Sequence, residues 1–112
     1  MDFKDKLIEC AKMLEDRKAL DTVILELKGL SSISDYFMIS SGTNSRHAAS
    51  LADYAEDFFA EQGIHAHHKE GLQGSDWIVL DYMDFMIHVF NEEKREYYNL
   101  DKVWQAAKKI YG

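Results

Sequence analysis

The chain has 112 residues, a formal net charge of −7 and a hydrophobic content of 46%. This length suits one domain, spanning 1–112, with one hydrophobic core, and no apolar run approaches the ~20 residues of a membrane-spanning helix. The 20 acidic residues outnumber the 13 basic ones, which disfavours direct contact with nucleic-acid phosphates and suits a basic protein partner.

The first predicted element is an amphipathic helix at the start of the chain. Apolar residues recur from Phe3 to Leu14 at spacings that place them on one helix face, and Asp2 can cap the amino end. The single cysteine, Cys10, lies on that face, which favours a buried and inert thiol. Charges within the first ten residues interrupt any secretory signal. The expected location is therefore the cytoplasm.

Two strands are predicted next, over 22–27 and 36–40, both rich in β-branched and other apolar residues. Neither strand alternates cleanly between apolar and polar residues, which is typical of central strands covered on both sides. A second amphipathic helix is predicted from Ala48 to Gly63, since glycine suits the position after a helix. Residues 64–69 are short enough for a third strand.

The segment WIVLDYMDFMIHVF, residues 77–90, is apolar in both phases of strand alternation. A two-residue turn at Met83 and Asp84 would pair its halves as a hairpin. One face would carry Ile78, Leu80, Tyr82, Phe85, Ile87 and Val89, and the other Trp77, Val79, Asp81, Met86, His88 and Phe90. The second composition is typical of the buried centre of a protein interface. The alternative is that a helix of the same chain covers this face.

A final amphipathic helix is predicted over 100–111, with Asn99 as its cap, after a charged segment that would normally be solvated. The element order becomes α-β-β-α-β-β-β-α. This order predicts an α/β (α+β) fold, with a mixed sheet of about five strands flanked by helices, and leaves the strand order open.

Four segments in this order resemble the ribosomal silencing factor RsfS, or Iojap-like, family: SDYFMISSGTNSRH (34–47), EG (70–71), WIVLDYMDFMIHVF (77–90) and REYYNLDKVW (95–104). The resemblance implies a nucleotidyltransferase-like fold and no enzymatic activity. It implies a protein that binds the large ribosomal subunit through ribosomal protein L-fourteen, blocks joining of the small subunit and so represses translation. Self-association as a homodimer is also implied. The alternative binding function is that of a large-subunit assembly factor at the same site.

Carried over to the matching positions, the partner-binding residues implied by the resemblance are Trp77, Leu80, Asp81, Tyr82, His88, Phe90, Arg95 and Tyr98. The aromatic residues would supply desolvated contact area, and the three polar or charged residues would fix orientation. A two-residue turn places Leu80 and Tyr82 on the other face, so either the register differs or these two residues support the core.

Met83 stands where the family usually has glycine. A type I′ or II′ turn requires a positive φ there, which costs a non-glycine residue about 1 kcal/mol. A longer turn or a turn of another type is the alternative.

An enzymatic function would need a phosphate-binding turn and metal-binding carboxylates on adjacent strands. SGTNS (41–45) faintly resembles such a turn, but no D-x-D pair follows it, and Asp53, Glu56 and Asp57 fall on a solvated helix face. His65 and His67 share one strand face without a third ligand of fixed spacing. We therefore predict no catalytic residue, metal or cofactor.

Overall fold

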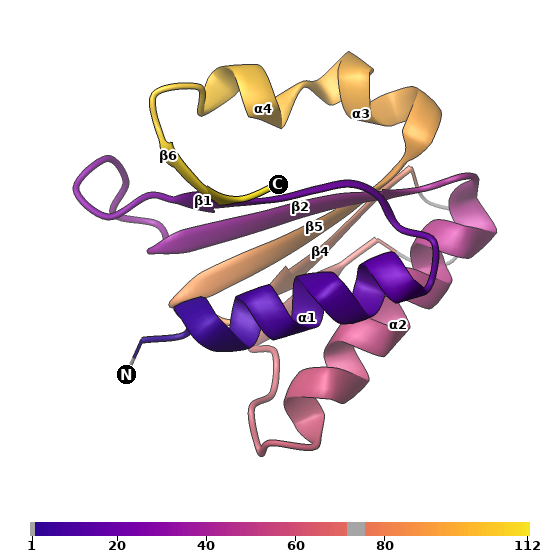
Figure 1. Cartoon of the computed structure of the whole chain (residues 1–112), viewed down its shortest axis with the longest axis horizontal. Coiled ribbons are helices and arrows are strands. Elements are labelled where there is room, and N and C mark those ends of the chain that lie inside the picture. The colour runs from indigo at the N-terminus through magenta and orange to yellow at the C-terminus, as the bar shows by residue number, and fades with distance from the viewer. Residues whose placement is uncertain (1, 72–75) are drawn as a thin grey trace.

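The computed structural model describes residues 2–71 and 76–112. Its elements are α1 (Lys4–Asp16), β1 (Leu20–Glu26), β2 (Tyr36–Gly42), α2 (Ser45–Ala60), β3 (His68–Glu70), β4 (Trp77–Asp81), β5 (Phe85–Asn91), α3 (Glu92–Tyr98), α4 (Leu100–Val103) and β6 (Lys108–Tyr111). The strands form one six-stranded sheet in the order β3-β4-β5-β2-β1-β6 (Figure 1). The central pair, β2 and β5, is parallel, and the other neighbouring pairs are antiparallel.

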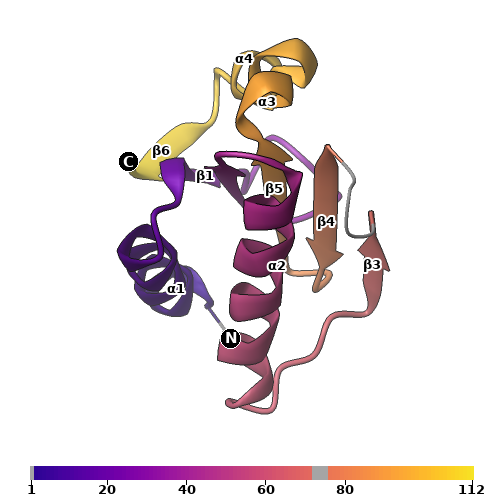
Figure 2. The same ribbon diagram turned by 90° about the vertical axis from the view of Figure 1, so that its right-hand side faces the viewer.

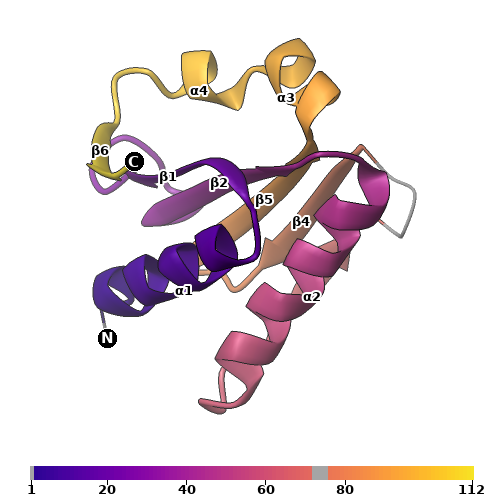
Figure 3. The same cartoon turned by 45° about the vertical axis from the view of Figure 1, so that its right-hand side comes forward.

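The sheet separates two layers of helices. Helices α1 and α2 lie against one face, and the segment with α3 and α4 lies over the other, as Figures 1 and 3 show. The sheet edges are β3 and β6, which lie on opposite sides of the molecule in Figure 2. The predicted α+β fold with a mixed sheet is confirmed, with six strands in place of about five.

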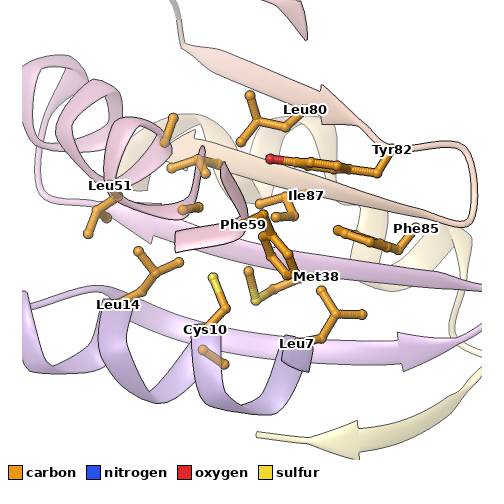
Figure 4. Close-up of a cluster of buried hydrophobic side chains, with 14 of the residues drawn as sticks. Leu7, Cys10, Leu14, Met38, Leu51, Phe59, Leu80, Tyr82, Phe85 and Ile87 are labelled. Carbon is orange, nitrogen blue, oxygen red and sulfur yellow. The ribbon is translucent and has the colours of Figure 1, made fainter. Parts of the chain in front are cut away.

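The main core lies between the sheet and helices α1 and α2 (Figure 4). Helical spacing brings Leu7, Cys10 and Leu14 of α1 to its buried face, as predicted. The end of β2 approaches α2 so closely that a Cβ at Gly42 would lie 2.5 Å from the backbone nitrogen of Ala48. This close approach, which only glycine allows, holds the first turns of α2 against the end of β2.

The hairpin of β4 and β5 has the predicted register, with Leu80 opposite Ile87 and Ile78 opposite Val89. The Tyr82 N–H donates to the Phe85 carbonyl at 2.9 Å, which leaves Met83 and Asp84 as the two turn residues, so the alternative of a longer turn is wrong. Met83 has a φ of 69°, and the N–H of Asp84 donates to the carbonyl of Tyr82 at 2.9 Å. This is the hydrogen bond of a γ-turn, which is strained at positive φ. Oδ1 of Asp81 accepts the Met83 N–H at 2.8 Å and helps to hold this geometry.

The carboxyl-terminal segment corrects the sequence prediction. The expected helix over 100–111 ends at Val103, where α4 ends, and Lys108–Tyr111 form β6, which pairs with the outer edge of β1. Asn99 caps α4 as predicted, since its side chain accepts from the Lys102 N–H. The charged segment before it, for which no element was predicted, is helix α3, capped by Asn91. Pairing with β1 satisfies backbone groups that would otherwise remain at a sheet edge.

The third predicted strand is shorter than expected, since β3 covers only His68–Glu70. Among the described residues, no helix combines the length and apolar character needed to cross a bilayer.

Candidate partner-binding surface

The second face of the hairpin is half covered by the same chain. Leu100, Trp104 and Ala107 pack over a cluster that includes Phe37 and Phe90. The covering segment therefore protects the β1, β2 and β5 part of this face. Toward β3, side chains of Trp77, Val79, Asp81 and Met86 remain partly exposed and line an open pocket of about 390 Å³ together with His68, Glu70, Gly71 and His88. The interpretation that a segment of the same chain covers this face is therefore confirmed for one half, and the other half remains open to a partner.

Trp77, which lines this pocket, belongs to a group of three packed aromatic rings. Trp77 stacks on Phe90 with ring centroids 5.1 Å apart, and Tyr98 of α3 lies 4.8 Å from Trp77. Phe90 is fully buried, whereas 39% of Tyr98 is exposed. Trp77 and Tyr98 are therefore the accessible aromatic groups, and Phe90 supports them from below. Tyr97, which was not among the predicted site residues, is the most exposed aromatic side chain beside them.

His88 lies at the base of the same surface with only 4% of its area exposed. Its Nδ1 accepts a hydrogen bond of 3.0 Å from Nε1 of Trp77, and its ring packs 4.5 Å from that of Phe37. Burial lowers the pKa of His88 to about 4, with Asp81 opposing the shift. The imidazole is therefore neutral at pH 7.

Arg95 is bound within the chain. Its Nε and Nη2 donate to the two carboxylate oxygens of Asp101 at 3.1 Å each. Its Nη1 donates to Oγ of Ser41 at 3.1 Å and to the backbone carbonyl of Asp21. The guanidinium thus joins α3 to α4 and to the adjacent ends of β1 and β2. It holds the helix that carries Tyr98, and four of its five N–H donors are used inside the molecule.

Leu80 and Tyr82 lie on the other face of the hairpin, in the core under α2 (Figure 4). They are 0% and 4% exposed, and the Tyr82 ring stacks on Phe85 at 4.5 Å. Because the predicted register is present, the alternative that these two residues support the core is the correct one. They have no surface to offer a partner. The Tyr82 hydroxyl has no hydrogen-bond partner among the described residues, and burial raises its pKa.

The expected site residues are therefore divided by the fold. Trp77, Asp81, His88 and Tyr98 line or border one surface, whereas Phe90 and Arg95 support it and Leu80 and Tyr82 lie behind it. Val79 and Met86 also line the pocket but were not selected as site residues. The period-two alternation of the strands places them on the same face as Trp77 and His88, so the sequence alone could have identified them as site residues.

The features considered for metal or phosphate binding do not form such sites among the described residues. His65 and His67 are exposed and precede strand β3, and His68 pairs with Glu70 at 2.9 Å. Within residues 2–71 and 76–112, no group of three or more His, Cys, Asp or Glu is placed to hold a metal ion. At the start of α2, the Thr43 N–H donates to Nδ1 of His47 and the Asn44 side chain caps the helix. Two backbone N–H groups of this segment, those of Thr43 and His47, thus already donate to side chains of the same chain and are not free to bind a phosphate.

Comparison with known proteins places the chain in a family. The family model described as "Ribosomal silencing factor during starvation" matches residues 1–111. The chain belongs to the RsfS family. It is 34% identical over 107 residues to ribosomal silencing factor RsfS of Bacillus subtilis, a match that covers 96% of this chain and 91% of the relative.

Two more distant relatives of this RsfS chain are informative. A mouse protein named "Mitochondrial assembly of ribosomal large subunit protein 1" is 28% identical over 95 residues, which cover 82% of this chain and 42% of the mouse protein. A crystal structure of a Chromobacterium violaceum protein superposes with a TM-score of 0.87 at 24% identity, over 100% of this chain and 93% of the other. The second match supports the fold.

Proposed function

We propose that this protein is a ribosomal silencing factor that binds the large ribosomal subunit through ribosomal protein L-fourteen. By occupying the surface that the small subunit needs, it prevents subunit joining and represses translation in the cytoplasm. The single observation that carries this proposal is the half-covered hairpin face, with accessible Trp77 and Tyr98 beside an open pocket, in a chain of the RsfS family.

The composition of this surface suits a basic protein. Its aromatic groups supply apolar contact area of the kind that dominates binding energy. Two carboxylates, Asp81 and Glu70, line the pocket, and the whole chain has a net charge of −7. Such a charge steers association with a basic partner. A standard footprint of about 800 Å² per partner is within reach of a domain of this size.

The predicted site residues take different parts in this proposal. Trp77, Asp81, His88 and Tyr98 would contact the partner, with Asp81 and His88 providing polar contacts. Phe90 would support the aromatic anchors, Arg95 would hold α3 in position, and Leu80 and Tyr82 would stabilise the hairpin from its other face. A homodimer that buried Trp77 and Tyr98 would compete with ribosome binding.

A large-subunit assembly factor is the second candidate function, because the mouse relative is named for assembly of the large subunit. Sucrose-gradient sedimentation separates the two functions. Silencing predicts that the protein added to mature particles sediments with free large subunits and reduces the fraction of joined ribosomes. Binding to immature particles without any effect on joining would instead favour assembly.

A matched pair of variants tests the surface. Tyr98 and Tyr54 are each 39% exposed, but Tyr54 lies on α2 on the other side of the sheet. Tyr98→Ala should weaken co-sedimentation with large subunits and pull-down by purified ribosomal protein L-fourteen, whereas Tyr54→Ala should leave both unchanged. Equal behaviour of the two variants would refute the proposed surface.

We further propose that the protein is a binding module without catalytic activity or cofactor. Isothermal titration with nucleoside triphosphate and Mg²⁺ should give no binding heat. Saturable micromolar binding would revive the nucleotidyltransferase-like enzyme as a function.

A further inference from the structure

The hydrogen bonding of His88 is incomplete at the pocket. The side chain lines the pocket with Trp77 and Met86, but only 4% of its area is exposed. Its Nε2 is covered by the surrounding protein and has no hydrogen-bond partner among the described residues. Buried polar groups in native proteins nearly always have a partner, because a buried donor without an acceptor destabilises the folded state. This nitrogen therefore requires an explanation.

The contact with Trp77 determines which nitrogen carries the proton. An indole N–H can only donate, so Nδ1 of His88, at 3.0 Å from Nε1 of Trp77, must accept. A neutral imidazole has one proton, which is then on Nε2. The unpartnered atom is thus an N–H donor of fixed identity, and Trp77 sets the tautomer.

The charges around the pocket restrict the acceptor. Asp81 and Glu70 contribute carboxylates to its lining, and of the described residues that line it, none is a lysine or arginine. An anionic acceptor such as a phosphate or carboxylate would face these like charges without compensation. A carbonyl oxygen has no such cost, and the apolar walls of Val79 and Met86 suit the rest of a peptide segment.

We propose that docking of the protein partner displaces the side chains that cover Nε2 of His88, so that Nε2–H donates to a neutral carbonyl oxygen of the partner. Trp77 acts as the positioning residue that fixes the donor tautomer. This inference rests on the proposed function, because it assigns the chemistry that the partner presents at the same surface. It selects an uncharged carbonyl over a phosphate or carboxylate oxygen as the group bound at the pocket. Trp77 then has two roles, as an aromatic anchor and as the partner of Nδ1.

Long-range ¹H–¹⁵N NMR of the histidine rings tests both halves of the proposal on the unmodified chain. The protein has five histidines, and the signals lost in His88→Phe identify those of His88. At pH 7 the free protein should show a protonated Nε2 and an unprotonated Nδ1. On addition of purified ribosomal protein L-fourteen, the Nε2 proton should shift downfield and become protected from exchange with water.

Two results would overturn the inference while the proposed function stands. One is a free protein with the proton on Nδ1 of His88. The other is a stable complex in which the Nε2 proton neither shifts nor gains protection, as expected if a buried water alone completes this group. If no complex forms, both the proposed function and the carbonyl contact are refuted. The tautomer of His88 is then still tested by the spectrum of the free protein.

Variants give a second measurement. His88→Phe removes the donor and should weaken binding about tenfold, because the carbonyl of the partner is left unpaired. Trp77→Phe keeps an aromatic ring but removes the indole N–H, so both His88 tautomers should appear in its spectrum. The effects of the two substitutions on affinity should be less than additive. A Trp77→Phe variant with an unchanged single tautomer would show that Trp77 does not position the ring.

Discussion

The two faces of the hairpin formed by β4 and β5 have similar apolar content but different surroundings. On one face, Ile78, Leu80 and Ile87 are sealed beneath α1 and α2. On the other, the covering segment reaches Phe90 but leaves Trp77, Val79 and Met86 partly exposed. An apolar strand face is therefore available for docking only where the rest of the chain does not cover it. The polar groups Asp81 and His88 occur on the face that remains open.

Neighbouring substitutions on β4 test this difference most directly. Leu80→Ala should lower the free energy of unfolding by roughly 3 to 4 kcal/mol, because it opens a cavity in the sealed core. Val79→Ala, one residue away on the open face, should cost less than about 1 kcal/mol. Chemical denaturation measures both values. Similar losses would show that the two faces are equally well packed.

Lowering the pH should lower the free energy of unfolding, because His88 on the open face is buried as a neutral side chain. Its pKa is about 4 in the folded protein and about 6.5 when unfolded, so the unfolded chain binds the proton more readily between these values. The neutral His88 therefore makes its full contribution to the free energy of unfolding above pH 6.5. This contribution is lost as the pH falls toward 4, by about 3 kcal/mol in total. Denaturation curves at pH 7 and pH 4.5 measure the loss. His88→Phe should show a smaller dependence on pH in this range, and an equal dependence would exclude His88 as its source.

Arg95 tests whether the open face depends on the position of α3. Arg95→Ala removes the pair with Asp101 and the contacts to Asp21 and Ser41, and should cost about 2 kcal/mol. Because Tyr98 then loses its support, binding to large subunits should weaken as well. Arg95→Lys keeps the charge but not the paired donors, so it should restore little of either property. Full binding by a folded Arg95→Ala variant would contradict the role in positioning α3.

Tyr82→Phe has the smallest expected effect. It tests whether Tyr82 supports the core or contacts the partner. Since the Tyr82 hydroxyl is buried without a partner among the described residues, its removal should raise the free energy of unfolding by up to about 1 kcal/mol. Binding to large subunits should be unchanged. Weaker binding by this variant would mean that the hydroxyl reaches a partner.

The sequence alone determined the local features of this protein. Alternation of period two, together with a two-residue turn, predicted the register and both faces of the hairpin correctly, because strand pairing across a tight turn depends on adjacent residues. Helical spacing likewise identified the buried faces of α1 and α2. The motifs in 34–47 and 77–104 led to the RsfS family, which the family match confirms.

Only the tertiary structure decided features that join distant segments. The apolar spacing of 100–111 also fits a helix, but these residues divide between α4 and a strand because the edge of β1, more than 80 residues earlier, offers backbone partners. The sequence alone indicates that Arg95 is a solvated surface charge. The fold places Asp21 and Ser41 next to it, where they accept its hydrogen bonds. The burial of His88 beside Phe37 depends on the parallel pairing of β5 with β2. Local pattern specifies which side chains share a face, whereas contacts between distant segments determine which face remains open.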